Sequence, residues 1–303
     1  MSHRDFLTLL DFTTEELDYV VRRAIDLKAR RNEGQLSEPL KGKSLAMVFE
    51  LASTRTRVGF EVAMSELGGQ AIFLSPADTH LGRGEPVADT ARVLSQMVHI
   101  VMLRTAKHET IERFAEHSSV PVINAMSDLG HPCQLLADVQ TYVEHRGDIR
   151  GRKVAFIGDG YNMCNSYINA SRRFEFDLTI ATPKEYAPDP ERVRCNASRV
   201  RLVNDPAEAV QGSDLVVTDV WSSMGHEKEL QHRRRCFKGF EVTLELLDRA
   251  SPDALFMHCL PAHRGEEVSE EVMEDQRSVV WQEAGNRMHS QKALIEFLLL
   301  GRQ

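Results

Sequence analysis

The sequence lacks several features that would place a protein in a special class. It has no run of about eighteen apolar residues, so no membrane-spanning segment is expected. Its five cysteines are odd in number and form no C-x-x-C pair, which argues against a disulfide framework and a zinc knuckle. With a formal net charge of -8, it also lacks the basic excess of nucleic-acid-coating proteins. The N-terminus shows no apolar core flanked by basic residues, so a cytoplasmic protein is expected.

Short apolar runs alternate with segments of helical periodicity along the whole chain. This alternation is typical of βαβ units and predicts an α/β fold with parallel sheets flanked by helices. The length of 303 residues, with 42% apolar residues, suggests two domains. The runs that we predict to be strands are 44–49, 71–75, 99–104, 120–124, 153–158, 176–182, 200–204, 214–220, 254–260 and 278–282.

A polar break near residues 145–151 marks the expected domain boundary. Pro132 suits the first position of the helix before it, and Gly147 and Gly151 bracket the break. We therefore predict one domain over 1–147 and a second over 148–286. The apolar segment 287–303 is predicted to form a C-terminal helix that joins the first domain.

The run Ser53-Thr54-Arg55-Thr56-Arg57 stands between a predicted strand and a predicted helix. Ser53 or Thr54 is expected at the helix N-cap. This hydroxyl, the free backbone N–H groups, the helix dipole and two guanidinium groups together suit a dianionic phosphate. The alternative is an ordinary N-cap followed by solvated arginines. Arg104 ends another predicted strand and His131 follows a further one, at the same edge of the sheet, which favours the phosphate site.

Four motifs carry a resemblance to a known family: STRTR, LRT at 103–105, HPCQLLAD at 131–138 and HCLPAHRGEEV at 258–268. In this order and spacing, the chain resembles the aspartate/ornithine carbamoyltransferase family over essentially its full length. The resemblance implies the carbamoyltransferase fold and a homo-oligomer, a trimer or a multiple of trimers. It also implies that the N-terminal domain binds carbamoyl phosphate.

The resemblance assigns roles to individual residues of the first substrate site. Arg104 is expected to contact phosphate and carbonyl, while His131 and Gln134 address the carbamoyl group. Arg83 is a candidate contributor from a neighbouring subunit. The complete set implied for carbamoyl phosphate is Ser53, Thr54, Arg55, Thr56, Arg83, Arg104, His131, Gln134, Cys259, Leu260 and Arg287.

The string TDVWSSMGHE, residues 218–227, indicates the second substrate. Asp219 offers a carboxylate to an ammonium group, and the loop has no basic residues to meet the two carboxylates of aspartate. By resemblance, Asn162, Asp219, Ser223 and Met224 bind L-ornithine, and Arg104, His131, Cys259 and Asp219 are catalytic. The implied reaction gives L-citrulline and phosphate, in arginine biosynthesis rather than degradation. The alternative acceptors are putrescine and an acylated ornithine.

Two cofactor hypotheses are less favoured. GDGYNM, residues 158–163, suggests a dinucleotide site, but Met163 occupies the third glycine position. His258, Cys259 and His263 have a spacing that suits no common structural zinc site. No cofactor and no metal are predicted. Two non-catalytic interpretations are also less favoured, in which Cys259 is an inert packing residue or the whole chain is a binding homologue of the fold.

Two positions depart from the family pattern. Leu51-Ala52 precede STRTR where a lysine and a proline or small residue are frequent, and Gly285 stands where the family commonly carries glutamate. Neither change removes a predicted ligand group, although Gly285 bears on how Arg287 is held. A cis peptide bond is expected before Pro261.

Overall fold

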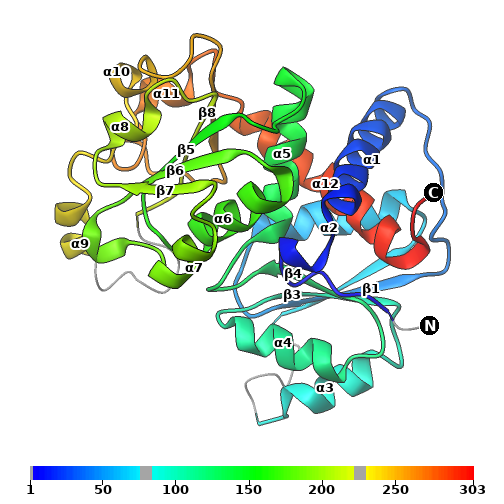
Figure 1. Cartoon of the computed structure of the whole chain (residues 1–303). Coiled ribbons are helices and arrows are strands. Elements are labelled where there is room, and N and C mark those ends of the chain that lie inside the picture. Colours follow the sequence, from blue (N-terminus) through cyan, green and yellow to red (C-terminus); the bar gives the residue numbers. More distant parts are fainter. Residues whose placement is uncertain (1–2, 76–83, 222–229) are drawn as a thin grey trace. The chain divides into compact units, whose positions relative to one another are not determined.

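The computed structural model describes residues 3–75, 84–221 and 230–303. The chain divides into two compact units, Met1–Gln140 with Gly285–Gln303, and Thr141–Ala284. It passes from one unit to the other within helix α5 (Pro132–Arg146) and returns within helix α12 (Val280–Leu300) (Figure 1). The domain limits that the sequence suggests, between residues 147 and 148 and between residues 286 and 287, stay a prediction.

The first unit contains a four-stranded parallel sheet in the order β2-β1-β3-β4. The chain adds β2 on one side of β1 and then β3 on the other, so the strand order reverses between β1 and β3. Phe49 at the end of β1 pairs with Arg104 at the end of β3. Ligands of open parallel sheets bind at such a reversal, outside the carboxyl ends of the strands. The strands are β1 (Ser44–Phe49), β2 (Gln70–Leu74), β3 (Ile100–Arg104) and β4 (Val122–Met126).

Helices cover both faces of this sheet (Figure 1). On one face, Val48 and Val101 of the sheet pack with Phe114 of α4 in a buried apolar cluster that also includes residues of α3. The opposite face carries α1, α2 and parts of α5 and α12. The helices of this unit not yet given are η1 (Leu9–Asp11), α1 (Thr14–Asn32), α2 (Thr54–Glu66), α3 (Val87–Leu94) and α4 (His108–His117).

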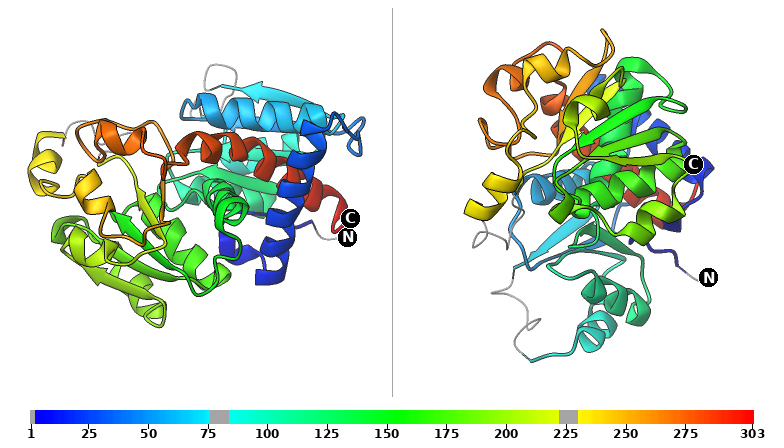
Figure 2. Two further views of the ribbon diagram at one scale, coloured as in Figure 1. Left: turned by 90° about the horizontal axis from the view of Figure 1, so that it is seen from above. Right: turned by 60° about the vertical axis from the view of Figure 1, so that its left-hand side comes forward.

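The C-terminal helix α12 lies beside α1 (Figure 1 and Figure 2). Arg23 Nε on α1 donates to Glu296 Oε2 at 2.6 Å, and the rings of Phe12 and Phe297 have centroids 5.1 Å apart. These contacts fix the end of the chain to the first unit, so residues such as Arg287 reach that sheet from far along the sequence.

The second unit has a five-stranded parallel sheet in the order β7-β6-β5-β8-β9. The chain adds β6 and then β7 on one side of β5. It then places β8 and β9 on the other side, so the strand order reverses between β5 and β8. The segments that follow β5 and β8 therefore flank the expected ligand position. The strands are β5 (Lys153–Ile157), β6 (Asp177–Ala181), β7 (Val200–Val203), β8 (Leu215–Thr218) and β9 (Leu255–His258).

Helix α6 packs on one face of the second sheet, where Tyr167 meets Phe156 of β5 with ring centroids 5.7 Å apart. The other face is buried under α8, α10 and α11 in a cluster that includes Val216, Leu247 and Val272. The helices of this unit are α6 (Asn162–Phe174), η2 (Lys184–Tyr186), α7 (Pro190–Cys195), α8 (Pro206–Val210), α9 (Leu230–Cys236), α10 (Leu244–Leu247) and α11 (Glu270–Met273).

One predicted strand is wrong. Residues 278–282 belong mainly to α12, which begins at Val280 and so starts seven residues before the predicted helix. Ser278 forms an isolated bridge with Phe256, and no further ladder follows it in the described part of the chain. Val280, Glu283 and Arg287 are buried whereas Trp281 is 54% exposed, which is the spacing of one helix face. The β-branched and aromatic composition of this run favoured a strand, but its burial has a helical period.

The glycine-containing turn of GDGYNM has a packing role. A Cβ atom on Gly160 would lie 2.3 Å from the backbone nitrogen of Pro188 and 2.5 Å from the carbonyl oxygen of Tyr186. Gly160 N–H also donates to that carbonyl, at 2.9 Å. The glycine therefore permits two backbone segments to touch, which explains its presence without a dinucleotide.

Gly160→Ala is expected to destabilise the protein by about 1–3 kcal/mol, because neither backbone segment can move without disturbing its neighbours. The matched control is Gly285→Ala, where an added Cβ would meet nothing within 4 Å. That exposed position inside α12 should gain up to about 1 kcal/mol. Urea unfolding of both variants measures the two changes, and equal stabilities would contradict the packing role of Gly160.

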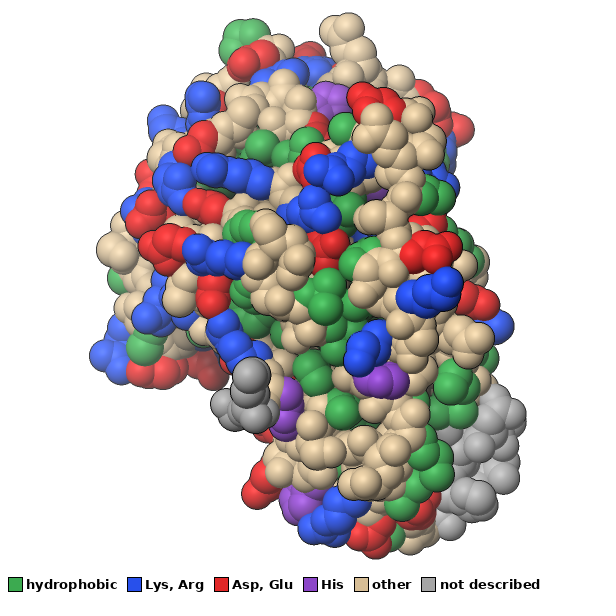
Figure 3. Space-filling model, turned by 90° about the vertical axis from the view of Figure 1, so that its right-hand side faces the viewer, with side chains coloured by type: hydrophobic (Ala, Val, Ile, Leu, Met, Phe, Trp, Pro, Cys, Tyr) green, Lys and Arg blue, Asp and Glu red, His purple; other side chains and the backbone are tan. Residues whose placement is uncertain are grey.

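Charges are mixed over the surface. Among the described side chains on the face drawn in Figure 3, basic and acidic groups are interspersed, and no continuous basic surface is visible there. This agrees with the net charge of -8. Within the described ranges, no helix combines the length and apolar character needed to cross a membrane.

Candidate functional site

In the first unit, the turn from β1 into α2 forms a capped helix start at the sheet edge. Ser53 is the N-cap residue, and its hydroxyl oxygen accepts the Thr56 N–H at 3.3 Å. Thr54 is the first residue of α2 and is exposed. The first N–H groups of a helix and its dipole attract anions, so this turn presents positive potential beyond the strand ends.

Two buried arginines converge on the hydroxyl of Thr56. Arg104 Nη1 and Arg287 Nη2 donate to Thr56 Oγ1 at 3.4 and 3.0 Å. The Ser53 hydroxyl donates to the same oxygen at 3.0 Å. Arg104 and Arg287 are only 6% and 3% exposed. Residues from α2, β3 and α12 thus direct donors toward one point, as an anion site requires.

His131 is buried and lies in the positive field of these groups. Burial, followed by the charges of Arg287, Arg104 and Arg55, lowers the pKa of His131 well below its ordinary value. The imidazole is therefore neutral at physiological pH. A neutral imidazole can donate a hydrogen bond to a carbonyl oxygen without adding a further charge.

Gln134 is oriented by two neighbours, one of which the sequence analysis missed. Its amide oxygen accepts from Arg287 Nη1 at 2.6 Å, and its amide nitrogen donates to Asp138 Oδ1 at 2.9 Å. Asp138 is 2% exposed. The available signal was the spacing of Gln134 and Asp138 on one helix face within HPCQLLAD.

The two arginines of STRTR differ in their surroundings. Arg55 is half-buried and near enough to lower the pKa of His131. Arg57 is exposed, lies over the ring of Phe73 at 3.8 Å and pairs with Glu61 at 3.4 Å. Only Arg55 therefore joins the cluster. Arg83 lies outside the described residues.

In the second unit, Asp219 follows β8 and Cys259 follows β9. The Cys259 thiol donates to Asp219 Oδ1 at 3.1 Å, and the Val220 N–H donates to the same oxygen at 2.8 Å. Burial raises the pKa of Asp219, while the nearby His258 and the Cys259 thiol act in the opposite direction. A buried carboxylate next to a thiol at a strand end suits an ammonium group.

A buried network, absent from the sequence analysis, holds the turn after β9. The Leu260 N–H donates to His258 Nδ1 at 2.9 Å, so the opposite nitrogen carries the proton and donates to Glu267 Oε1 at 3.1 Å. The backbone N–H of His258 donates to Glu283 Oε2 at 2.9 Å. Leu260 has a left-handed backbone with φ 56°, and the Leu260–Pro261 bond is cis as expected. Both ring nitrogens of His258 are engaged, which disfavours the zinc trio with Cys259 and His263.

Asn162 lies in the segment that follows β5, the strand next to β8 at the reversal of strand order. It is the first residue of α6 and 5% exposed, so it lies where that helix dipole favours a carboxylate. The segment before it is held by a buried ion pair between Asp159 and Arg233 at 2.5 Å. The sequence analysis missed this pair, because 74 residues separate its members. Ser223 and Met224 lie outside the described residues.

The structure therefore groups the predicted residues at two sheet edges. Ser53, Arg55, Thr56, Arg104, His131, Gln134 and Arg287 form one cluster in the first unit. Asp219, Cys259 and Leu260 adjoin one another in the second unit, with Asn162 at the helix start nearby in the topology. Thr54 is exposed at the start of α2, so its role beside the first cluster stays a prediction.

Comparison with known proteins matches both units. Residues 4–144 match the profile described as aspartate/ornithine carbamoyltransferase, carbamoyl-P binding domain, and residues 150–298 match its Asp/Orn binding domain. The chain belongs to the aspartate/ornithine carbamoyltransferase family. This bears out the resemblance carried by the four motifs.

Individual carbamoyltransferases resemble the chain over nearly their whole length. The ornithine carbamoyltransferase of Nitrosococcus oceani is 60% identical over 98% of this chain and 97% of its own. A relative from Pseudomonas aeruginosa named as the anabolic form is 58% identical over 99% of this chain and 98% of its own. The solved structure from Pyrococcus furiosus has a TM-score of 0.95 at 45% identity, covering 100% of this chain and 99% of that one. The predicted fold of two parallel-sheet domains is confirmed.

Proposed function

We propose that this chain transfers the carbamoyl group of carbamoyl phosphate to the side-chain amine of L-ornithine, giving L-citrulline and phosphate. The amine nitrogen attacks the carbonyl carbon, a C–N bond forms, and the C–O bond to phosphate breaks. The observation that carries this proposal is the convergence of Arg104 and Arg287 on Thr56, beside the neutral His131. Relatives named as anabolic support a role in synthesis rather than degradation. We propose that the chain acts in arginine biosynthesis, in the cytoplasm.

The first cluster would hold carbamoyl phosphate by its two polar ends. Ser53, Thr54, Arg55 and Thr56 hold the phosphate at the start of α2, and Arg287 adds a further charge. Arg104 spans phosphate and carbonyl, while His131 and Gln134 address the carbamoyl oxygen and amide. These donors stabilise the oxyanion that forms as the amine attacks. Cys259 and Leu260 are proposed as further contacts of the carbamoyl group.

The second unit would hold the amino acid. Asn162 at the start of α6 receives the α-carboxylate, and Asp219 with Cys259 orients the side-chain nitrogen. Ser223 and Met224 are proposed to complete this site. The amine must react uncharged although a free alkylammonium has a pKa of about 10, so it must lose a proton on binding or in the reaction. The departing phosphate accepts that proton in this proposal, and positioning supplies most of the rate.

The assembly is proposed to be a homotrimer or a multiple of trimers. The family resemblance supports this, and it would allow Arg83 to act at the site of a neighbouring subunit. Light scattering on the purified chain gives the mass, and mixed oligomers of Arg83→Ala and inactive subunits would show whether the residue acts across the interface.

A parallel steady-state assay tests the proposed function. Carbamoyl phosphate is supplied with ornithine, putrescine, acetylornithine or aspartate, and each carbamoylated product is quantified. We expect turnover with ornithine to exceed that with each of the other amines. Faster turnover with putrescine or acetylornithine would show that this amine, and not ornithine, is the substrate. No turnover with any amine would favour a non-catalytic binding protein.

His131→Ala is expected to lower kcat by about 10²-fold, because one donor to the developing oxyanion is lost. Phosphate affinity should be little changed, since the arginines remain. Because the pKa of His131 lies well below its ordinary value, the acid limb of the pH–rate profile should be the same in both proteins. His117→Ala, at a partly exposed histidine of α4, is the control. An unchanged kcat in His131→Ala would contradict the role in polarising the carbonyl.

A further inference from the structure

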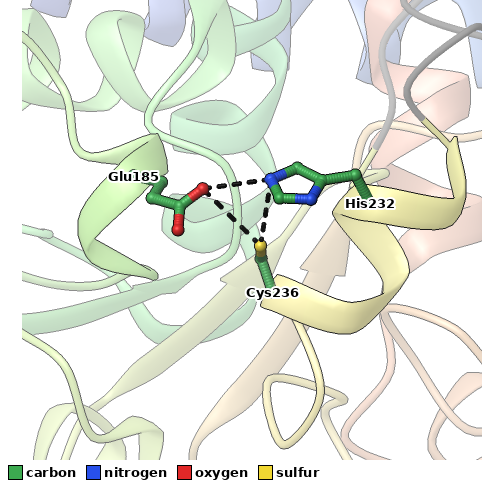
Figure 4. A group of neighbouring side chains, drawn as sticks. All are labelled: Glu185, His232 and Cys236. Carbon is green, nitrogen blue, oxygen red and sulfur yellow. Dashed lines mark hydrogen bonds and ion pairs between the residues drawn. The ribbon is translucent and has the colours of Figure 1, made fainter.

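A second group of chemically competent side chains lies on η2 and α9 and has no part in the proposed reaction (Figure 4). Glu185 comes from η2, and His232 and Cys236 come from α9, four residues apart on one helix face. One donor atom from each residue lies within 4.8 Å of the other two. Carboxylate, imidazole and thiolate are the three ligand types that zinc prefers in proteins.

The distances between these donor atoms are close to those between the ligands of a tetrahedral zinc ion. Glu185 Oε2 lies 3.1 Å from His232 Nε2, and Cys236 Sγ lies 3.5 Å from that nitrogen and 3.8 Å from that oxygen. Tetrahedral zinc, with its ordinary bond lengths to sulfur, nitrogen and oxygen, places such donors about 3.3–3.7 Å apart. One ion therefore fits between the three atoms after small side-chain movements.

Contacts that do not involve the three donors hold η2 against α9. The rings of Tyr186 and Phe237 have centroids 5.0 Å apart, and the Arg233 guanidinium lies 4.5 Å from the centroid of Tyr186. Arg233 is itself fixed by Asp159 at 2.5 Å. Because this packing brings the helices together before any ion binds, the site is organised in advance.

We propose that Glu185, His232 and Cys236 bind one divalent transition-metal ion of the zinc class, with water as the fourth ligand. Glu185 and His232 are exposed, so solvent reaches the remaining position. The Cys236 thiol releases its proton to solvent when its sulfur bonds to the ion, and His232 binds through Nε2 as the neutral imidazole. The thiolate ligand selects this class over Mg²⁺ and Ca²⁺. The alternative is a hydrogen-bonded triad that holds no ion.

The experiment must separate this site from the group formed by Asp219, His258 and Cys259, whose donor atoms also lie within 4.8 Å of one another. The full chain carrying Cys259→Ser is therefore titrated with Co²⁺. Absorbance follows the thiolate–cobalt charge-transfer band, and Zn²⁺ competition gives the affinity. The same titration is made after adding Cys236→Ser, His232→Ala or Glu185→Gln. Cys195→Ser is the matched control, because Cys195 is an exposed thiol that donates to Glu191 Oε1 at 3.3 Å.

The Cys259→Ser chain is expected to bind one equivalent of Co²⁺ with a thiolate band, and the control should do the same. Adding Cys236→Ser should abolish the band, and each of the three ligand substitutions should weaken binding by at least about tenfold. Circular dichroism checks folding, and Glu185→Gln, at an exposed position, provides the conservative variant. A Cys259→Ser chain without a thiolate band, or a band that survives Cys236→Ser, overturns the proposal.

Discussion

Replacing Arg104 with methionine is expected to lower kcat/KM for carbamoyl phosphate by about 10³-fold, as the loss of a preorganised charged donor at an oxyanion does. Arg104 is 6% exposed and donates to Thr56 Oγ1 at 3.4 Å, in the cluster with Arg287 and His131. Methionine is a shorter, unbranched side chain that fills the space of the arginine stem and carries no charge. Initial rates at varied carbamoyl phosphate, with saturating ornithine, measure the change.

Arg57→Met is the control, since it removes the same charge at an exposed arginine of α2 that pairs with Glu61. It should leave kcat/KM nearly unchanged. Arg104→Met is not expected to lower the melting temperature greatly. Arg55, Arg104 and Arg287 are neighbouring cations that repel one another, and the substitution removes one of them. A general loss of stability in Arg104→Met, or equal activity losses in both variants, would show that Arg104 acts structurally.

The sheet strands and the order of the polar loops could be predicted from the sequence because they depend on local patterns. Nine of the ten predicted strands overlap β1 to β9, and of the two residues expected at the N-cap of α2, Ser53 and Thr54, it is Ser53 that caps the helix. The tenth, 278–282, was wrong because apolar content alone does not separate a strand from a buried helix turn. The start of α12 is set by packing, which local composition does not record.

The missing parts of the candidate sites depend on contacts between distant residues. Asp138 supports Gln134 from one turn away, but Glu267 and Glu283 support His258 through the fold of the second unit. Glu185 and His232 are 47 residues apart, so no spacing rule joins them. Such residues were identified only when the structure placed their donor and acceptor atoms together.

Asp219→Asn is expected to lower kcat/KM for ornithine by about 10²–10³-fold while leaving the KM of carbamoyl phosphate unchanged. An amide oxygen can still accept from Cys259 and from the Val220 N–H, so the turn should be preserved. What is lost is the negative charge that pairs with the ammonium of the amino acid. Steady-state kinetics with each substrate varied in turn separate the two effects.

The raised pKa of Asp219 predicts a second effect of this variant: its stability should increase where its activity falls. Because burial raises the pKa of Asp219 above its value in the unfolded chain, the stability from its protonated form is present at low pH and is lost as pH rises through the folded-state pKa. Asparagine does not ionise, so Asp219→Asn should be more stable than the original chain at about pH 8, with the difference shrinking toward about pH 4. Thermal unfolding over this range measures it. An Asn variant that is less stable at every pH, with both KM values raised, would mean that Asp219 supports the fold rather than the amine.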